Sequence, residues 1–229
     1  ATVGPTLLQR IFASVKYRDY RLVWLGSCTE HIGEFMELAA LLWLVHDLTR
    51  SPLMLTLVGS CRYIPMIFFS MIGGVVTDRM NRRNLLVLSL LAYAANSTVL
   101  GILVATKLVV LWHIIVASLL IGVITSFNHP ARSSMIPNLV QKEHLLNAIS
   151  LDSASVMSAR VIGMPIAGAI IGFASVMPIF FLRAFGAVMA TLWLSQVNVP
   201  PTPAAARKRD PWKNLVEGLR YVAGYGTVL

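Results

Sequence analysis

Three glutamates lie close together in an apolar stretch near the start of the chain. Glu30, Glu34 and Glu37 are spaced by four and three residues, which places them within roughly 60° of arc on one helical face. A charged side chain at this depth costs roughly 2.5–3.5 kcal/mol by insertion scales. The stripe therefore faces a water-filled cavity or a partner helix. Its chemistry is either proton exchange, for which Glu34 is the best candidate, or a structural network of ion pairs.

Arginines within other apolar stretches are the expected partners of these acids. Arg62, Arg160 and Arg183 each lie inside such a stretch, so three bases nearly neutralise three acids. At about 1.5 Å per helical residue, Glu34, Arg62 and Arg160 lie near the middle of their helices, and we expect Glu34 to pair with Arg62. His31 points about 100° away from the stripe and is expected to pack or to form hydrogen bonds between helices. The candidate proton or substrate cavity comprises Glu30, Glu34, Glu37, Arg62 and Arg160.

Six apolar stretches must position these side chains. They cover residues 21–46, 52–77, 84–106, 108–128, 148–173 and 177–196. Each is long enough to cross about 30 Å of hydrocarbon, which takes about 20 helical residues. Hydrophobic residues make up 56% of the 229 residues, charged residues 13%, and the mean hydropathy is +0.71, whereas soluble domains carry about 25% charged residues. The composition excludes a soluble protein and predicts an all-α membrane protein with six transmembrane helices.

Basic residues are unevenly distributed over the connections. The chain carries 19 Lys and Arg against 10 Asp and Glu, a net charge of +9. With a cytoplasmic N-terminus, 14 of the basic residues fall on the cytoplasmic side, Arg132 among them, and only Arg50 and Lys107 fall outside. Because Lys and Arg favour cytoplasmic loops, this bias predicts a cytoplasmic N-terminus. It also accounts for the positive charge without nucleic acid as a partner.

The connection between the second and third stretches carries regularly spaced charges after a glycine pair. It reads Gly73-Gly74-Val75-Val76-Thr77-Asp78-Arg79-Met80-Asn81-Arg82-Arg83. This segment resembles the loop signature G-x-L-A-D-R-x-G-R-R of the major facilitator superfamily, with matches at Gly74, Asp78, Arg79, Arg82 and Arg83. The resemblance implies a cytoplasmic latch between two halves of a transporter, with Asp78 as the matched latch residue. Asn81 stands where the signature has glycine, and we expect it to tolerate a left-handed backbone.

Two further segments resemble one branch of this superfamily. Asn128-His129-Pro130-Ala131-Arg132 and Arg160-Val161-Ile162-Gly163 are similar to the exporters that include drug/proton antiporters and siderophore exporters. Gly163, Pro165 and Gly168 match the helix-kink motif of that branch with the proline displaced by one position, and the antiporter motif R-x-x-Q-G is missing from the fourth stretch. The resemblance implies one half of a twelve-helix fold with 3+3 inverted repeats. It also implies proton-coupled efflux of a small organic solute, drug-like or siderophore-like, by alternating access.

The domain organisation follows from these stretches. We expect a six-helix bundle at 1–197, a cytoplasmic linker at 198–212 and the start of a second half at 213–229. The expected partners are protons, a small-molecule substrate, the lipid bilayer of a bacterial cytoplasmic membrane and a missing carboxyl-terminal half. No ATPase phosphate-binding loop, H-E-x-x-H, paired C-x-x-C or G-x-S-x-G motif occurs, so we expect no enzyme, cofactor or metal. A transporter of lipid or of another solute, and a membrane scaffold without transport, stay open as alternatives.

Overall fold

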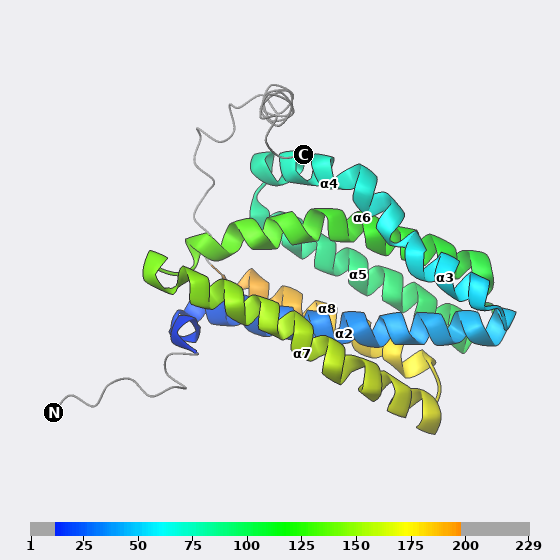
Figure 1. The fold of residues 1–229 in the computed structure, drawn as a ribbon. Coiled ribbons are helices and arrows are strands. Elements are labelled where there is room, and N and C mark those ends of the chain that lie inside the picture. Colours follow the sequence, from blue (N-terminus) through cyan, green and yellow to red (C-terminus); the bar gives the residue numbers. More distant parts are fainter. Residues whose placement is uncertain (1–11, 198–229) are drawn as a thin grey trace, which may run out of the picture.

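The computed structural model describes residues 12–197, which form a bundle of long helices (Figure 1). The α-helices are α2 (Arg18–Thr49), α3 (Pro52–Cys61), α4 (Tyr63–Arg79), α5 (Arg82–Ala105), α6 (Leu111–Met135), α7 (Leu145–Phe173) and α8 (Met177–Ser195). The 3-10 helices are η1 (Ala13–Lys16), η2 (Ile136–Asn138) and η3 (Lys142–His144). This part of the chain contains no strand, and the predicted all-α class is confirmed. The predicted linker at 198–212 and the segment 213–229 lie outside the described residues.

Each of the six apolar stretches corresponds to one helix or to a pair of helices. Five segments are long and apolar enough to cross a membrane, among them the pair α3–α4 and the single helices α5 and α8. Helix α2 is not among these five because Glu30, Glu34 and Glu37 lie in its central part. Its 32 residues nevertheless amount to about 48 Å of helix. The chain therefore has the helices of a six-span membrane protein, with all three acids of the stripe on the first.

The second span is interrupted at Arg62. Helix α3 ends at Cys61 and α4 begins at Tyr63. Pro65 has no backbone N–H, so a continuous helix here would leave the carbonyl of Cys61 without its partner. The break places the Arg62 side chain at a junction between two shorter helices.

The fourth span is longer than predicted. Helix α6 continues past residue 128, through Pro130, to Met135, although the polar composition of this segment had indicated a connection. Pro130 cannot donate to the carbonyl of Ser126, and that carbonyl lies against Gly73 of α4, where any Cβ would overlap it. The longer helix carries Arg132 into the bundle.

Helix α2 is the centre of the packing. It packs along α7 and α8 and also touches α3 and α6, while α5 packs on α6 and α8, and α4 packs on α6 (Figure 1). Two apolar clusters of buried side chains lie along α2. One contains Tyr20 and Val23, and the other begins at Met36. Glu30 and Glu34 lie between the two clusters along α2, and Glu37 lies at the start of the second, so the three acids form a polar layer across the bundle.

Close helix contacts hold the interrupted span against α6. A Cβ at Gly122 of α6 would overlap the backbone carbonyl of Arg62. Together with the contact between Gly73 and Ser126, this leaves no room for a side chain at either glycine. The backbone at the α3–α4 junction is therefore held directly by α6.

The turn before α5 differs from the prediction. Asn81 has φ −67° and ψ 116°, an extended conformation rather than the left-handed one. Its side-chain oxygen accepts a hydrogen bond from the backbone N–H of Arg83 at 3.0 Å. Asn81 therefore caps the amino-terminal end of α5, which explains why asparagine serves here without positive φ.

Candidate functional site

Glu30 lies at the centre of a buried network, and both of its carboxylate oxygens accept hydrogen bonds from arginines. Its carboxylate accepts from Arg132 Nη2 at 2.6 Å and from Arg183 Nη2 at 3.1 Å. Arg183 Nη1 also donates to the backbone carbonyl of Glu30 at 2.9 Å. Only 3% of Glu30 is exposed. An acid with two guanidinium partners and almost no exposed surface is suited to holding α2, α6 and α8 together.

Glu37 belongs to the same network. Arg183 Nε lies 3.5 Å from its carboxylate, and Ser97 Oγ donates to it at 2.6 Å. The Arg183 guanidinium also lies over the ring of Tyr93, 4.8 Å from its centroid. Glu37, like Glu30, is 3% exposed.

His31 connects the network to α7. Arg132 Nη1 lies 2.6 Å from His31 Nε2, and Ser155 Oγ lies 3.1 Å from His31 Nδ1. Because arginine can only donate, Nε2 accepts and Nδ1 carries the proton. Ser155 in turn donates to the backbone carbonyl of Asp152 at 2.6 Å. The hydrogen bonding between helices expected for His31 is present. We call the set Glu30, His31, Glu37, Arg132 and Arg183 the closed cluster.

Glu34 is arranged differently from the other two acids. Arg62 Nη2 donates to its carboxylate at 2.5 Å, which is the expected pairing. The Glu34 side chain is 25% exposed and that of Arg62 is 14% exposed. Glu34 thus has a single guanidinium partner and partial access to the space between the helices. We call Glu34 and Arg62 the open pair.

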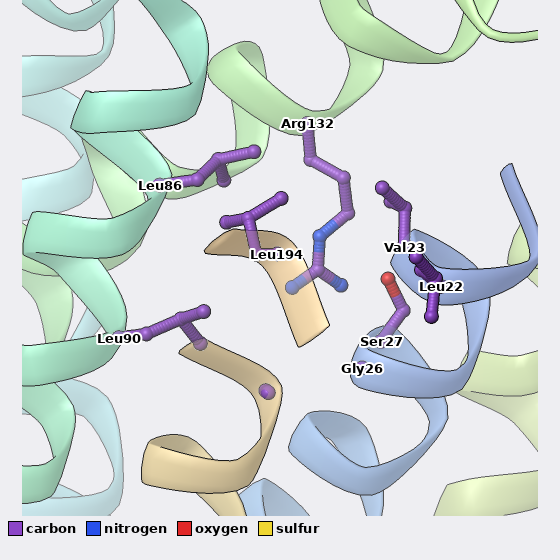
Figure 2. A pocket seen from close by; sticks show the side chains of 9 residues that line it. Leu22, Val23, Gly26, Ser27, Leu86, Leu90, Arg132 and Leu194 are labelled. Carbon is purple, nitrogen blue, oxygen red and sulfur yellow. The ribbon is translucent and has the colours of Figure 1, made fainter. Parts of the chain in front are cut away.

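The structure changes two assignments among the arginines. Arg160 is exposed on α7, with its guanidinium 5.2 Å from the centroid of the Phe35 ring, and it forms no ion pair with the described acids. Arg132, predicted to lie in a cytoplasmic connection, is only 9% exposed. Figure 2 shows its side chain extending from α6 toward Ser27, into the space between α2 and α8. Arg132 therefore takes the buried place that had been expected for Arg160.

A polar cavity adjoins both groups of charges. It encloses about 430 Å³ of space, part of it open to solvent, between α2, α5, α6 and α7. Its lining includes Glu34 and the edge of the closed cluster, together with Asn128, His129 and Asp152. The cavity lies toward the end of the bundle where α2 and α7 begin and α6 ends. The described side chains contain no group of three or more His, Cys, Asp or Glu arranged to hold a metal ion.

Two arginines of the loop motif bind within the chain. Arg82 Nη1 donates to the carbonyl of Ser134 at 2.8 Å. Arg83 donates to the carbonyls of Leu194 and Ser195 at the end of α8. Carbonyls at helix ends have no helical partners, and a cation there also interacts favourably with the helix dipole. These two arginines therefore fasten α5 to the ends of α6 and α8.

The remaining residues of the motif are described only in part. The backbone of Gly74, Asp78 and Arg79 belongs to the last turns of α4, while the side chains of Asp78 and Arg79 lie outside the described part of the structure. The latch between two halves that the motif implies therefore stays a prediction.

The helix-kink motif lies in a continuous helix. Gly163, Pro165 and Gly168 all belong to α7, with Pro165 in its interior. A Cβ at Gly163 would lie 2.9 Å from the carbonyl of Ile32 on α2, whereas nothing lies within 4 Å of one at Gly168. Gly163 thus has a packing role against α2, and a hinge at Pro165 stays a prediction.

The fold and its charged layer define a multi-pass, helical membrane protein, and comparison with known proteins gives the family. A family model described as transmembrane secretion effector matches residues 10–227. The chain belongs to this family, an efflux branch of the major facilitator superfamily. The predicted membership of that superfamily is confirmed.

Curated relatives agree with this membership. The chain is 22% identical over 200 residues to a macrolide efflux protein of Streptococcus pyogenes, and 26% identical over 200 residues to a staphyloferrin A transporter of Staphylococcus aureus. Each match covers 86% of this chain and 49% or 48% of the relative. An uncharacterized transporter of the same superfamily from Bacillus subtilis is 23% identical over 201 residues. The chain spans about half the length of these relatives, as expected for half of a major facilitator fold.

Proposed function

We propose that this chain is the amino-terminal half of a proton-coupled exporter of a small organic solute, and that Glu34 carries the proton. The observation behind the proposal is the contrast between the acids of α2. Glu30 and Glu37 are 3% exposed and held by guanidiniums, whereas Glu34 has one guanidinium partner and a side chain that is 25% exposed at the cavity. A group that exchanges protons needs access to water in at least one state, and Glu34 meets this condition.

The position of Arg62 supports a coupling between proton binding and helix movement. Protonation removes the charge of Glu34 and leaves the Arg62 guanidinium without its ionic partner. Arg62 lies at the junction between α3 and α4, where the helix is interrupted for one residue. A change of charge at Glu34 therefore alters the stability of this junction, which biases the side to which the cavity opens.

The proposed orientation places the N-terminus in the cytoplasm of a bacterial cell, with the cavity toward the cytoplasmic side. The positive residues Arg79, Arg82 and Arg83, at the end of α4 and the start of α5, support this placement, since such residues favour the cytoplasmic side. The proposed partners are protons, a small-molecule substrate and the second half of the transporter, and no catalytic activity is proposed. The names of the relatives suggest a macrolide or a siderophore as the first substrates to test.

The experiment is the Glu34→Gln variant of the complete protein in proteoliposomes. The amide keeps the shape and much of the hydrogen bonding but cannot exchange a proton at physiological pH. Erythromycin, a cation, and staphyloferrin A, a carboxylate anion, are the probes. We expect pH-gradient-driven transport of whichever probe the unmodified protein exports to fall to the level of empty liposomes, while the protein stays folded. Glu143→Gln, which removes an exposed carboxylate in η3, serves as the matched control and is expected to transport as the unmodified protein does.

Two outcomes contradict the proposal at different levels. Normal gradient-driven transport by Glu34→Gln means that Glu34 is structural and that the proton carrier is another acid. Failure of the unmodified protein to respond to a pH gradient with either probe contradicts proton-coupled export of these solutes. It then favours a transporter of lipid or of another solute, or a scaffold of the same fold.

A further inference from the structure

We infer that the cavity binds an organic cation and that Asp152 is the counter-ion for its positive charge. This inference deepens the proposed transport function by naming the charge of the substrate. It begins from a residue that the sequence did not single out. Asp152 lies on α7, one position beyond the buried Leu151, and its half-buried side chain lines the cavity.

Asp152 differs from the other acids around the cavity because it has no ionic partner. No Lys, Arg or His nitrogen in the described part of the chain lies within 4 Å of its carboxylate, whereas Glu30, Glu34 and Glu37 each have a guanidinium. The charge of Arg132 interacts with that of Asp152 only at a separation beyond 4 Å. The guanidinium nitrogens of Arg132 are already bonded to Glu30 and His31.

The sum of charges around the cavity is negative. Four carboxylates belong to the cavity and its adjoining cluster, at Glu30, Glu34, Glu37 and Asp152, against the three guanidiniums that pair with the first three. His31 is neutral in the hydrogen-bond arrangement described above, and His129, which also lines the cavity, is counted as neutral at pH 7. One negative charge is therefore left over, and it lies at Asp152. A cavity of this kind favours a monovalent cation over an anion of the same size.

A second observation indicates a ligand in the same space. Asn128 lines the cavity and is only 3% exposed, yet its side-chain Nδ2 has no hydrogen-bond partner among the described residues. A buried amide donor without a partner costs about 1–3 kcal/mol. A hydroxyl, ether or carbonyl oxygen on the ligand satisfies it. The class of ligand that fits both groups is an organic cation that also carries a hydrogen-bond acceptor.

The test compares two dyes of similar size and opposite charge on the complete protein in lipid nanodiscs. The probes are rhodamine 123, a monocation with an ester group, and fluorescein, an anion. Binding is measured by fluorescence polarisation without a proton gradient, with empty nanodiscs to subtract binding to lipid. We expect the unmodified protein to bind rhodamine 123 at least tenfold more tightly than fluorescein.

Variants at Asp152 locate the effect. Asp152→Asn is expected to weaken rhodamine 123 binding at least tenfold, whereas Asp152→Glu keeps it within about threefold of the unmodified protein, corresponding to about 0.7 kcal/mol or less. Glu143→Gln removes one acid near the start of α7, outside the cavity lining, and is expected to leave binding unchanged. Preference for fluorescein, equal binding of the two dyes, or equal losses in Asp152→Asn and Glu143→Gln overturns the inference.

The design separates this inference from the proposed function. Binding is measured without a gradient and does not depend on proton coupling. The binding result therefore holds whether or not Glu34→Gln loses transport. If Asp152→Asn fails to fold, the preference of the unmodified protein between the two dyes still decides whether the cavity favours a cation or an anion. Cation binding without gradient-driven transport supports the site and contradicts the proton coupling.

Discussion

The closed cluster and the open pair both join glutamates of α2 to arginines from other parts of the bundle, yet they differ in burial and in the number of partners. Glu30 and Glu37 are 3% exposed and share Arg183, while Glu34 has Arg62 alone and a side chain that is 25% exposed. Three to four residues along α2 therefore separate an acid enclosed by guanidiniums from one with a single guanidinium partner and partial exposure. Burial and number of partners, more than residue type, distinguish the two kinds of acid.

The largest effect is expected for Glu30→Gln. The change removes the charge that two buried guanidiniums share, and breaking a buried ion pair typically costs 3–5 kcal/mol because the partner stays charged. We expect most of the protein to be lost as aggregate on detergent extraction. The remainder is expected to unfold at a clearly lower temperature, as measured by size-exclusion chromatography and a thermal unfolding assay.

Asp47→Asn is the matched control for this variant. Asp47 lies on the same helix, and its carboxylate is 3.9 Å from Arg50 in a pair whose side chains are 67% and 77% exposed. Exposed pairs contribute about 0–1 kcal/mol, so its stability is expected to be nearly unchanged. If Glu30→Gln is as stable as Asp47→Asn, the closed cluster does not hold the bundle together.

An intermediate effect is expected at the open pair. In a double-mutant cycle of Glu34→Gln and Arg62→Gln, measured by thermal unfolding, we expect an interaction free energy of about 0.5–3 kcal/mol. The double variant should be better assembled than Arg62→Gln alone, because neither side chain then keeps an unpaired charge. Strictly additive effects of the two changes contradict the pairing, even if Glu34 proves essential for transport.

The smallest effect is expected for Arg160→Gln. Among the described residues its guanidinium lies over the Phe35 ring and forms no ion pair, and a cation–π contact at an exposed site contributes about 0.5–1 kcal/mol. The unfolding midpoint is expected to shift by a few degrees at most. A loss comparable to that of Glu30→Gln means that Arg160 has an ionic partner after all, which restores the role the sequence had suggested for it.

Sequence reasoning located the helices and the open pair because both depend on quantities that a sequence contains. Span length follows from runs of apolar residues, and the depth of Glu34 and Arg62 follows from counting residues at a fixed rise per residue. Their contact at 2.5 Å agrees with that count. The family followed from spaced motifs and is confirmed by a match over residues 10–227.

The rest of the site depends on helix ends and helix rotation, which the sequence did not supply. Arg132 follows a proline and polar residues, so it was placed in a connection, whereas α6 continues to Met135 and turns it inward. Asp152 and Arg160 both lie on α7, within the apolar stretch 148–173, but only Asp152 lines the cavity. The spacing of Asn128 and Arg132, four residues apart, was the available signal that both lie on one helical face.

The order of the charged residues along the chain has a consequence for biosynthesis. Glu30 belongs to the first span, but its partners Arg132 and Arg183 follow it by 102 and 153 residues. At about 5–20 residues per second, the ribosome delivers Arg132 about 5–20 s after Glu30 and Arg183 about 8–30 s after it. During this interval the first span carries carboxylates that no later helix has yet neutralised. Helix α8 is the last to contribute, so its arrival completes the charge compensation that allows α2 to settle in the bilayer.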